Sequence, residues 1–218
     1  MRKKKYIELP TGCLSYSQVS LWLSSPKRYK KLFFEQDESM RFMNDAMRYG
    51  SLFADALEHD KPTGDLMTDM VISMLEKYDI KDEEMTGEYI TKAGWLKIVS
   101  HPDGVDSKTK SIIEYKTGMV KWTQKKADNW FQIKFYAMLI YIIHGVVTPK
   151  AQLIWAETFR DTDGEIKPTG HVESFEVKID MKLILETMAI VTKAAKEIEL
   201  EWLSYVPEVN EFTTWISK

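Results

Sequence analysis

The fold of this chain depends most on the stretch Ser111-Ile112-Ile113-Glu114-Tyr115-Lys116, whose β-branched residues favour a β-strand. Alternate side chains of a strand share one face, so Glu114 and Lys116 are expected to point the same way. A second strand is predicted at residues 96–99, and the polar segment 106–110 between the two has the composition of a hairpin loop. We therefore expect an antiparallel hairpin at the centre of the domain.

A hairpin turn centred on residues 108–109 places Asp103 directly opposite Glu114, with Cβ atoms about 4.5–5.5 Å apart. Two carboxylates this close repel each other unless a cation lies between them. Mg²⁺ takes oxygen ligands and is commonly held by one or two carboxylates together with substrate phosphate. The pair therefore predicts a Mg²⁺ or Mn²⁺ site for phosphoryl transfer, where Lys116 can orient or deprotonate the attacking water and offset charge on the phosphorus oxygens.

The tripeptide Glu-x-Lys is weak evidence by itself, because it occurs three times in the chain. Glu165 begins a copy in a turn that contains glycine and proline. Glu176 begins a copy on a probable strand with Asp163 upstream, and its alternative interpretation is the polar face of an amphipathic strand. Glu114 is favoured because an acidic residue precedes it at hairpin spacing and a helix with polar groups follows.

That helix is predicted from about Lys126 to His144 and is apolar enough to be largely buried. Gln132 and Tyr136 are four residues apart and therefore share one face. A buried amide and a buried phenol need hydrogen-bond partners. Two interpretations remain open: these groups serve the active site, or they satisfy neighbouring groups in the core.

Taken in order, Pro102-Asp103, Glu114-x-Lys116 and Gln132-x-x-x-Tyr136 resemble the PD-(D/E)XK nuclease superfamily. The Gln-x-x-x-Tyr helix resembles its RecB-like branch, which includes CRISPR-associated RecB-like exonucleases and many phage exonucleases. Residues 14–29, with Leu14-Ser15-Tyr16-Ser17, Ser25-Pro26 and Tyr29, resemble the N-terminal helix signature of that branch, and residues 50–58 resemble its Gly-x-x-x-His helix. The resemblance covers about residues 14 to 145.

The resemblance implies a restriction-endonuclease-like α/β fold: a central mixed β-sheet flanked by helices, with an N-terminal helical part over the active-site cleft. It implies metal binding by Asp103, Glu114 and the main-chain carbonyl of Tyr115, and a catalytic role for Lys116. The implied activity is Mg²⁺- or Mn²⁺-dependent hydrolysis of DNA phosphodiester bonds, as an exonuclease in DNA recombination, repair or phage DNA processing. Gln132 and Tyr136 complete the implied catalytic set.

Two positions depart from the family pattern. Ala54 occupies the position where the branch usually carries a metal-binding histidine. Glu58, one turn further along the same helix face, can replace that ligand or can be a solvated carboxylate. Ser25 stands where iron–sulfur members carry a cysteine, and Cys13 is the only cysteine, so a four-cysteine iron–sulfur cluster and an intramolecular disulfide are both excluded.

The composition predicts one globular domain: 218 residues, 44% hydrophobic and 29% charged. Its expected parts are N-terminal helices (14–60), an acidic helical insert (61–90), the catalytic core (91–180), and a C-terminal helix with its tail (181–218). Helices are expected near residues 17–35, 45–58 and 65–78. A second hairpin is expected from residues 151–159 and 171–179, and the tail from residue 205 to residue 218. No apolar run of membrane-spanning length is present, and the basic N-terminus is not followed by an apolar signal core. We expect no membrane association and an intracellular, cytoplasmic location, the host cytoplasm if the chain is phage-encoded.

The formal net charge is −3, so contacts with nucleic acid must be local. The predicted DNA-binding residues are Ser17, Lys27, Arg28, Lys121, Lys125 and Trp122. Trp122 lies between two lysines and is predicted to stack on an unpaired base, whereas Trp130 is assigned to the core. The alternative for the lysines is a solvated helix end. His101 is a candidate auxiliary group because strand alternation places it on the side of Asp103.

Two other functions remain open. Ala54 and the acidic net charge favour a non-catalytic DNA-binding or assembly protein on a nuclease fold, and a structure-specific or nicking endonuclease is the third interpretation. The expected partner is single- or double-stranded DNA, with a recombination or repair protein as a further candidate. The sequence does not decide the oligomeric state.

Overall fold

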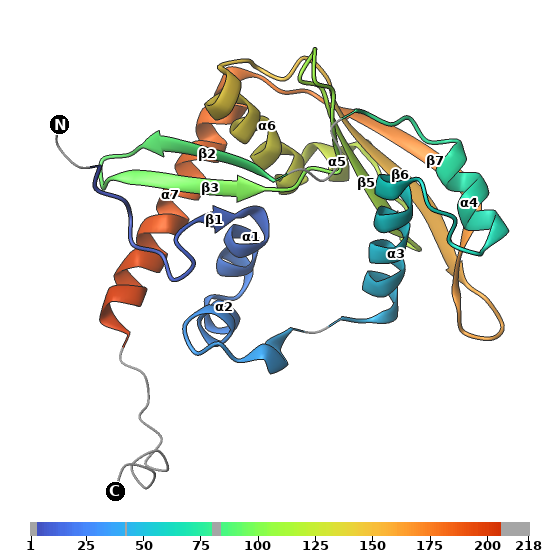
Figure 1. The fold of residues 1–218 in the computed structure, drawn as a ribbon, viewed down its shortest axis with the longest axis horizontal. Coiled ribbons are helices and arrows are strands. Elements are labelled where there is room, and N and C mark those ends of the chain that lie inside the picture. The colour runs from blue at the N-terminus through green and yellow to red at the C-terminus, as the bar shows by residue number, and fades with distance from the viewer. Residues whose placement is uncertain (1–3, 42, 80–83, 206–218) are drawn as a thin grey trace, which may run out of the picture.

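The computed structural model describes residues 4–41, 43–79 and 84–205 (Figure 1). Its N-terminal part contains one short strand, four α-helices and a 3-10 turn. These are β1 (Leu14–Ser15), α1 (Tyr16–Ser24), α2 (Pro26–Phe33), η1 (Glu38–Met40), α3 (Asp45–His59) and α4 (Leu66–Ser73). The remainder is β2 (Met85–Ile90), β3 (Trp95–Ser100), β4 (Gly104–Val105), β5 (Ile112–Gly118), α5 (Gln124–Asp128), α6 (Phe131–His144), β6 (Ala151–Arg160), β7 (Ile166–Val177) and α7 (Met181–Ser204).

The predicted α/β class is confirmed, with strands in two sheets. The larger sheet has the order β4-β5-β6-β7 and is mixed, because β5 and β6 are parallel while the other neighbours are antiparallel. The smaller sheet has the order β1-β3-β2. Residues 96–99 therefore form a strand as predicted, but this strand pairs with β1 and β2 and not with β5. The hairpin partner of β5 is the two-residue strand β4.

The polar residues of the N-terminal segment cap its helices. Ser15 is the N-cap of α1: its Oγ accepts from the Gln18 N–H at 3.3 Å, and the Gln18 side chain accepts from the Ser15 N–H at 2.7 Å. Ser25 is the N-cap of α2, with Pro26 at the first helical position. The single helix predicted from Ser17 to Glu35 is therefore wrong, because Ser25 and Pro26 end one helix and start another.

Three other predicted elements have different limits in the structure. The helix predicted from Lys126 is divided into α5 and α6. The acidic helix predicted at 65–78 is shorter, and α4 buries Val71 and Ile72 in the core. The second predicted hairpin is present as β6 and β7, although β7 begins at Ile166. Of the predicted tail, residues 205–218, all but Tyr205 lie outside the described residues.

The two faces of the larger sheet are covered by different helices (Figure 1). α3 and α4 pack on the face that carries Ile113 and Tyr115 of β5. α6 packs on the opposite face, and it also contacts β2 and β3 of the smaller sheet. Within the described part of the chain, no helix is both long enough and apolar enough to cross a membrane. The larger sheet thus presents Glu114 and Lys116 on the side that α6 covers.

Candidate active site

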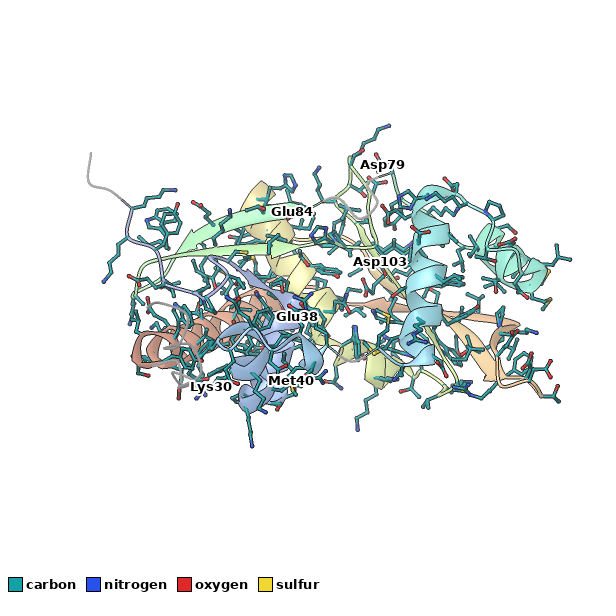
Figure 2. All side chains as sticks on the ribbon, turned by 60° about the horizontal axis from the view of Figure 1, so that its bottom comes forward. Lys30, Glu38, Met40, Asp79, Glu84 and Asp103 are labelled. Carbon is teal, nitrogen blue, oxygen red and sulfur yellow. The ribbon has the colours of Figure 1, made fainter. Side chains whose placement is uncertain are left out.

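β4 and β5 bring Asp103 and Glu114 together. Gly104 pairs with Ile113, so one further step in the same register sets Asp103 against Glu114. The N–H of Tyr115 donates to Oδ2 of Asp103 at 2.8 Å, which fixes this carboxylate at the edge of β5. In the view of Figure 2, Asp103 lies between the smaller sheet and α3. The predicted opposition of the two carboxylates is therefore present, although its hairpin differs from the predicted one.

Gly104 allows the close approach of β4 to β5. A Cβ atom at this position would overlap Cγ2 of Ile113, which is fully buried on β5. Because a buried branched side chain cannot move aside cheaply, any other residue here would push the two strands apart. The run Pro102-Asp103-Gly104 thus has a structural reason for its glycine that the sequence analysis did not identify.

Lys116 forms an ion pair with Oε1 of Glu114, and both side chains lie on one face of β5. The Glu114 side chain is fully buried, whereas the Lys116 side chain remains 25% exposed. Nζ of Lys116 also lies 5.7 Å from the centroid of the Trp130 ring. This aromatic contact stabilises a cation, a role beyond the core position that was predicted for Trp130.

The two carboxyl groups oppose each other's ionisation, because both are acidic and Glu114 is buried. Burial, and then the charge of Asp103, raise the pKa of Glu114 to about 8, and the nearby Lys116 acts in the opposite direction. Burial lowers the pKa of Lys116, but the charges of Glu114 and Asp103 outweigh it, so this pKa is raised overall. Lys116 is therefore protonated at neutral pH, and one positive charge faces two carboxyl groups.

The donor set fits a divalent cation. Oε2 of Glu114 is buried and has no hydrogen-bond partner among the described residues. A buried carboxylate oxygen is costly unless it is paired or coordinates a metal. Oxygen atoms of Glu114 and Asp103, together with the carbonyl of Tyr115 between Glu114 and Lys116, are the hard ligands that Mg²⁺ and Mn²⁺ prefer.

Gln132 and Tyr136 lie together on α6 and are linked by hydrogen bonds. The Gln132 amide donates to the Tyr136 hydroxyl at 2.6 Å, and that hydroxyl donates to the His101 carbonyl at 3.1 Å. Trp130 Nε1 donates to Gln132 Oε1 at 3.3 Å. Tyr136 therefore fixes the backbone two residues before Asp103, and the amide and the phenol satisfy each other. Their part in an active site stays a prediction.

Glu58 does not join the two carboxylates. Among the residues that the structure describes, no group of three or more His, Cys, Asp or Glu side chains can hold a metal ion. A described neighbour of Glu58 is His59, with Nε2 at 3.5 Å from Oε1. The predicted third protein ligand at Glu58 is therefore not supported, and Ala54 brings no ligand to its position.

The rival Glu-x-Lys copies have no such setting. Glu176 and Lys178 are exposed at one end of β7, while Asp163 lies in the turn at the opposite end of the β6–β7 hairpin. The imidazole of His101 is half exposed and lies 3.7 Å from Glu84. Its contribution to the site is the backbone carbonyl that accepts from Tyr136, a role the sequence does not indicate.

The predicted DNA-binding residues differ in their exposure to solvent and in the contacts that they already make. Ser17, Lys27, Arg28, Lys121 and Lys125 are all exposed. Arg28 donates to the Met40 carbonyl at 2.8 Å, and Lys121 lies 3.8 Å from Glu173. Trp122 is only 5% exposed and packs edge-on against Trp130, with ring centroids 5.0 Å apart. Its predicted stacking on a base is therefore wrong.

The likeness of this chain to known proteins is seen in solved structures. No protein-family model matches the chain, and no curated protein is significantly similar to it. SSO0001 has 12% identity and a TM-score of 0.49, covering 95% of this chain and 80% of that chain. The alkaline exonuclease LHK-Exo from Laribacter hongkongensis has 16% identity and a TM-score of 0.46, covering 88% of this chain and 90% of that chain. Rai1 of Candida albicans, in complex with pU5-Mn²⁺, has 12% identity and a TM-score of 0.34, covering 96% and 65%. At these TM-scores, function has to be argued from the residues of the site.

Proposed function

We propose that this protein is a Mg²⁺- or Mn²⁺-dependent nuclease that hydrolyses DNA phosphodiester bonds as an exonuclease. The observation that carries the proposal is the set of Asp103, Glu114 and Lys116 at one end of the β4–β5 hairpin, with the buried Oε2 of Glu114 left without a hydrogen-bond partner among the described residues. The ordered motifs that resemble PD-(D/E)XK nucleases support the same activity. The exonuclease assignment rests on that resemblance alone.

Each side chain has a role that follows from its position. Asp103, Glu114 and the Tyr115 carbonyl would hold the cation, which when bound lowers the pKa of a water molecule and offsets phosphate charge. Lys116 extends from the same face to the exposed side of the site, where its ammonium group can orient the attacking water and stabilise negative charge on the phosphate oxygens. Gln132 and Tyr136 are positioning residues, because they act on Asp103 through the His101 backbone.

DNA is the proposed substrate, with the exposed Lys27, Lys121 and Lys125 as phosphate contacts. DNA recombination, repair or phage DNA processing is the proposed setting. Contact with a recombination or repair protein belongs to the same proposal. An intracellular, cytoplasmic location accompanies it.

The first test is digestion of end-labelled linear DNA, single- and double-stranded, and of a closed circle, with Mg²⁺, Mn²⁺ or EDTA. We expect metal-dependent loss of linear DNA only, and loss of cleavage by more than about a hundredfold in Lys116→Ala. Lys178→Ala is the matched control, because the exposed Lys178 follows β7 directly and ends another Glu-x-Lys copy. Cleavage of the circle would show an endonuclease, and unchanged cleavage by folded Lys116→Ala would contradict the role of Lys116.

A second candidate function is a non-catalytic DNA-binding or assembly protein. It is favoured by the two-carboxylate donor set, which lacks a third acidic or histidine side chain among the described residues. Calorimetric titration with Mn²⁺ separates the two functions. The nuclease requires binding that Asp103→Asn weakens, whereas the scaffold predicts no binding or binding that this substitution does not change.

A further inference from the structure

A cavity of about 420 Å³ adjoins Lys116 on the side of α3. The described residues that line it come from α3 and β5. Those on α3 are mostly small or apolar: Ala46, Met47, Gly50, Ser51, Phe53 and Ala54. β5 contributes Tyr115, Lys116 and Thr117. Tyr115 and Lys116 also belong to the metal site described above, whereas the residues of α3 do not.

The wall formed by β5 is an open strand edge. β4 pairs only with Ile112 and Ile113, so among the described residues no strand pairs with this edge from Tyr115 to Gly118. The N–H of Tyr115 points to this side, where it meets Asp103, and the N–H of Thr117, two residues later, points the same way. Backbone donors along such an edge are available to a ligand.

The wall formed by α3 offers a surface for a flat ring. Ala46, Gly50 and Ala54 follow one another at intervals of four residues, so their small side chains leave the space open along one helix face. Met47 lines the same space and is 50% exposed. A polarizable thioether packs well against an aromatic ring, and the hydroxyl groups of Ser51 and Thr117 can bond to polar edges of a ligand.

We propose that this cavity holds the base and sugar of the nucleotide next to the phosphate that is cut, as one unstacked nucleotide. This inference rests on the proposed nuclease function. The volume lies within the range of about 300–1,000 Å³ that is typical of small-ligand sites. Tyr115 and Lys116 line the cavity and also belong to the metal site, and Asp103 is bound at the same edge of β5. A nucleotide in the cavity would therefore have its phosphate beside this edge and Asp103. Because one nucleotide enters, the strand must be unpaired at the point of cleavage.

The test combines a change in the cavity with a change in the DNA. Ala54→Leu adds three carbons inside the cavity, and Leu52→Phe adds three carbons to an exposed residue of α3 that does not line it. Each protein is assayed on single-stranded oligonucleotides that carry either normal bases or one abasic residue at successive positions. The rate of cleavage is measured at each bond.

With the wild type and with Leu52→Phe, we expect an abasic residue next to the cleaved bond to lower kcat/KM by about fivefold or more. Ala54→Leu should cut normal DNA more slowly by a similar factor and should no longer distinguish abasic from normal nucleotides. If Ala54→Leu and the abasic residue each lower kcat/KM by the same factor whether or not the other is present, the base and Ala54 act independently. That result would overturn the inference.

Gly50→Ala provides a second variant that should fold. The added Cβ would lie 3.5 Å from Oγ1 of Thr117, an ordinary contact, and alanine favours a helix more than glycine. We expect an unchanged or higher melting temperature together with a smaller abasic effect. An abasic effect equal to that of the wild type in both cavity variants would also overturn the inference.

A wild type that cuts no DNA would contradict the proposed function but would still leave the cavity testable. Binding of dAMP in the presence of Mg²⁺ can then be followed by calorimetry for the wild type, Leu52→Phe and Ala54→Leu. Binding weakened about tenfold or more only by Ala54→Leu would support a nucleotide site without nuclease activity. Equal binding by all three proteins, or no binding, would exclude the cavity as a nucleotide site.

Discussion

Glu114 is a carboxyl group that the fold buries completely and surrounds with only partial charge compensation. Lys116 pairs with one of its oxygens, and Asp103 adds a second negative group close by. A structural ion pair normally satisfies both oxygens of a buried carboxylate, because an unpaired buried charge destabilises the protein strongly. Incomplete charge compensation of a single buried residue, which lowers the stability of the fold, is typical of binding and catalytic sites.

Stability of the metal-free protein should therefore depend on the ionisation of Glu114. Its pKa is raised from 4.5 to about 8, so the folded protein binds a proton that the unfolded chain has already released between these values. This contribution to stability is complete below the unfolded pKa and is lost as the pH rises through the folded pKa. We expect the melting temperature in EDTA to fall from about pH 5 to about pH 8.

Glu114→Gln is the control for this pH dependence, because an amide of similar shape cannot ionise. Its melting temperature should change less over the same pH range. Addition of Mg²⁺ to the wild type should restore stability at the upper end of the range, since a ligand that binds only the folded state stabilises it. Identical pH profiles for the two proteins would show that another group is responsible.

At the level of elements, the two-residue strand β4 decides where Asp103 lies. Gly104→Ala should force β4 away from β5, because its Cβ would overlap the buried Cγ2 of Ile113. We expect a loss of about 1–3 kcal/mol in the free energy of unfolding and weaker Mn²⁺ binding. Chemical denaturation and calorimetry measure the two effects.

Ile113→Ala removes the atom that the new methyl group would meet. The double variant should therefore lose less stability than the sum of the two single variants, and its Mn²⁺ affinity should recover in part. Additive losses would show that the approach of β4 to β5 is not what holds Asp103.

The sequence predicted individual strands and helices more reliably than which strands pair and which helices pack together. The strand at 111–116 and the opposition of Asp103 to Glu114 follow from local patterns, because β-branched residues and a polar loop act over a few positions. Pairing of β3 with β1 and β2 depends on contacts between distant segments. Burial of Trp122 against Trp130 depends on how α5 and α6 pack, so flanking lysines were a misleading sign of exposure.

For the whole molecule, a net charge of −3 means that the proposed DNA substrate must be held by local positive groups. Affinity should fall with salt, with a slope of about −0.7 per phosphate contacted in single strands and about −0.9 in duplex DNA. Lys125→Ala should reduce the magnitude of the slope by about the contribution of one phosphate contact. Lys121→Ala should reduce it less, because Nζ of Lys121 already lies 3.8 Å from Glu173.

Lys182→Ala on α7 is a suitable control, since this side chain is 83% exposed and was not assigned to the DNA-binding set. Fluorescence anisotropy of a labelled oligonucleotide over a series of salt concentrations gives all the slopes. Equal slopes for Lys125→Ala and Lys182→Ala would remove Lys125 from the proposed DNA-binding surface.

α6 contacts both sheets, and this arrangement has a consequence for how the protein opens. The helix packs on β5 and β6 as well as on β2 and β3, and its Tyr136 bonds to the segment that joins the two sheets. A fluctuation that detaches α6 from one sheet would therefore also disturb its contacts with the other sheet. Amide hydrogens of β3, β5 and α6 should exchange with solvent together, as one cooperative unit at close to the cost of global unfolding.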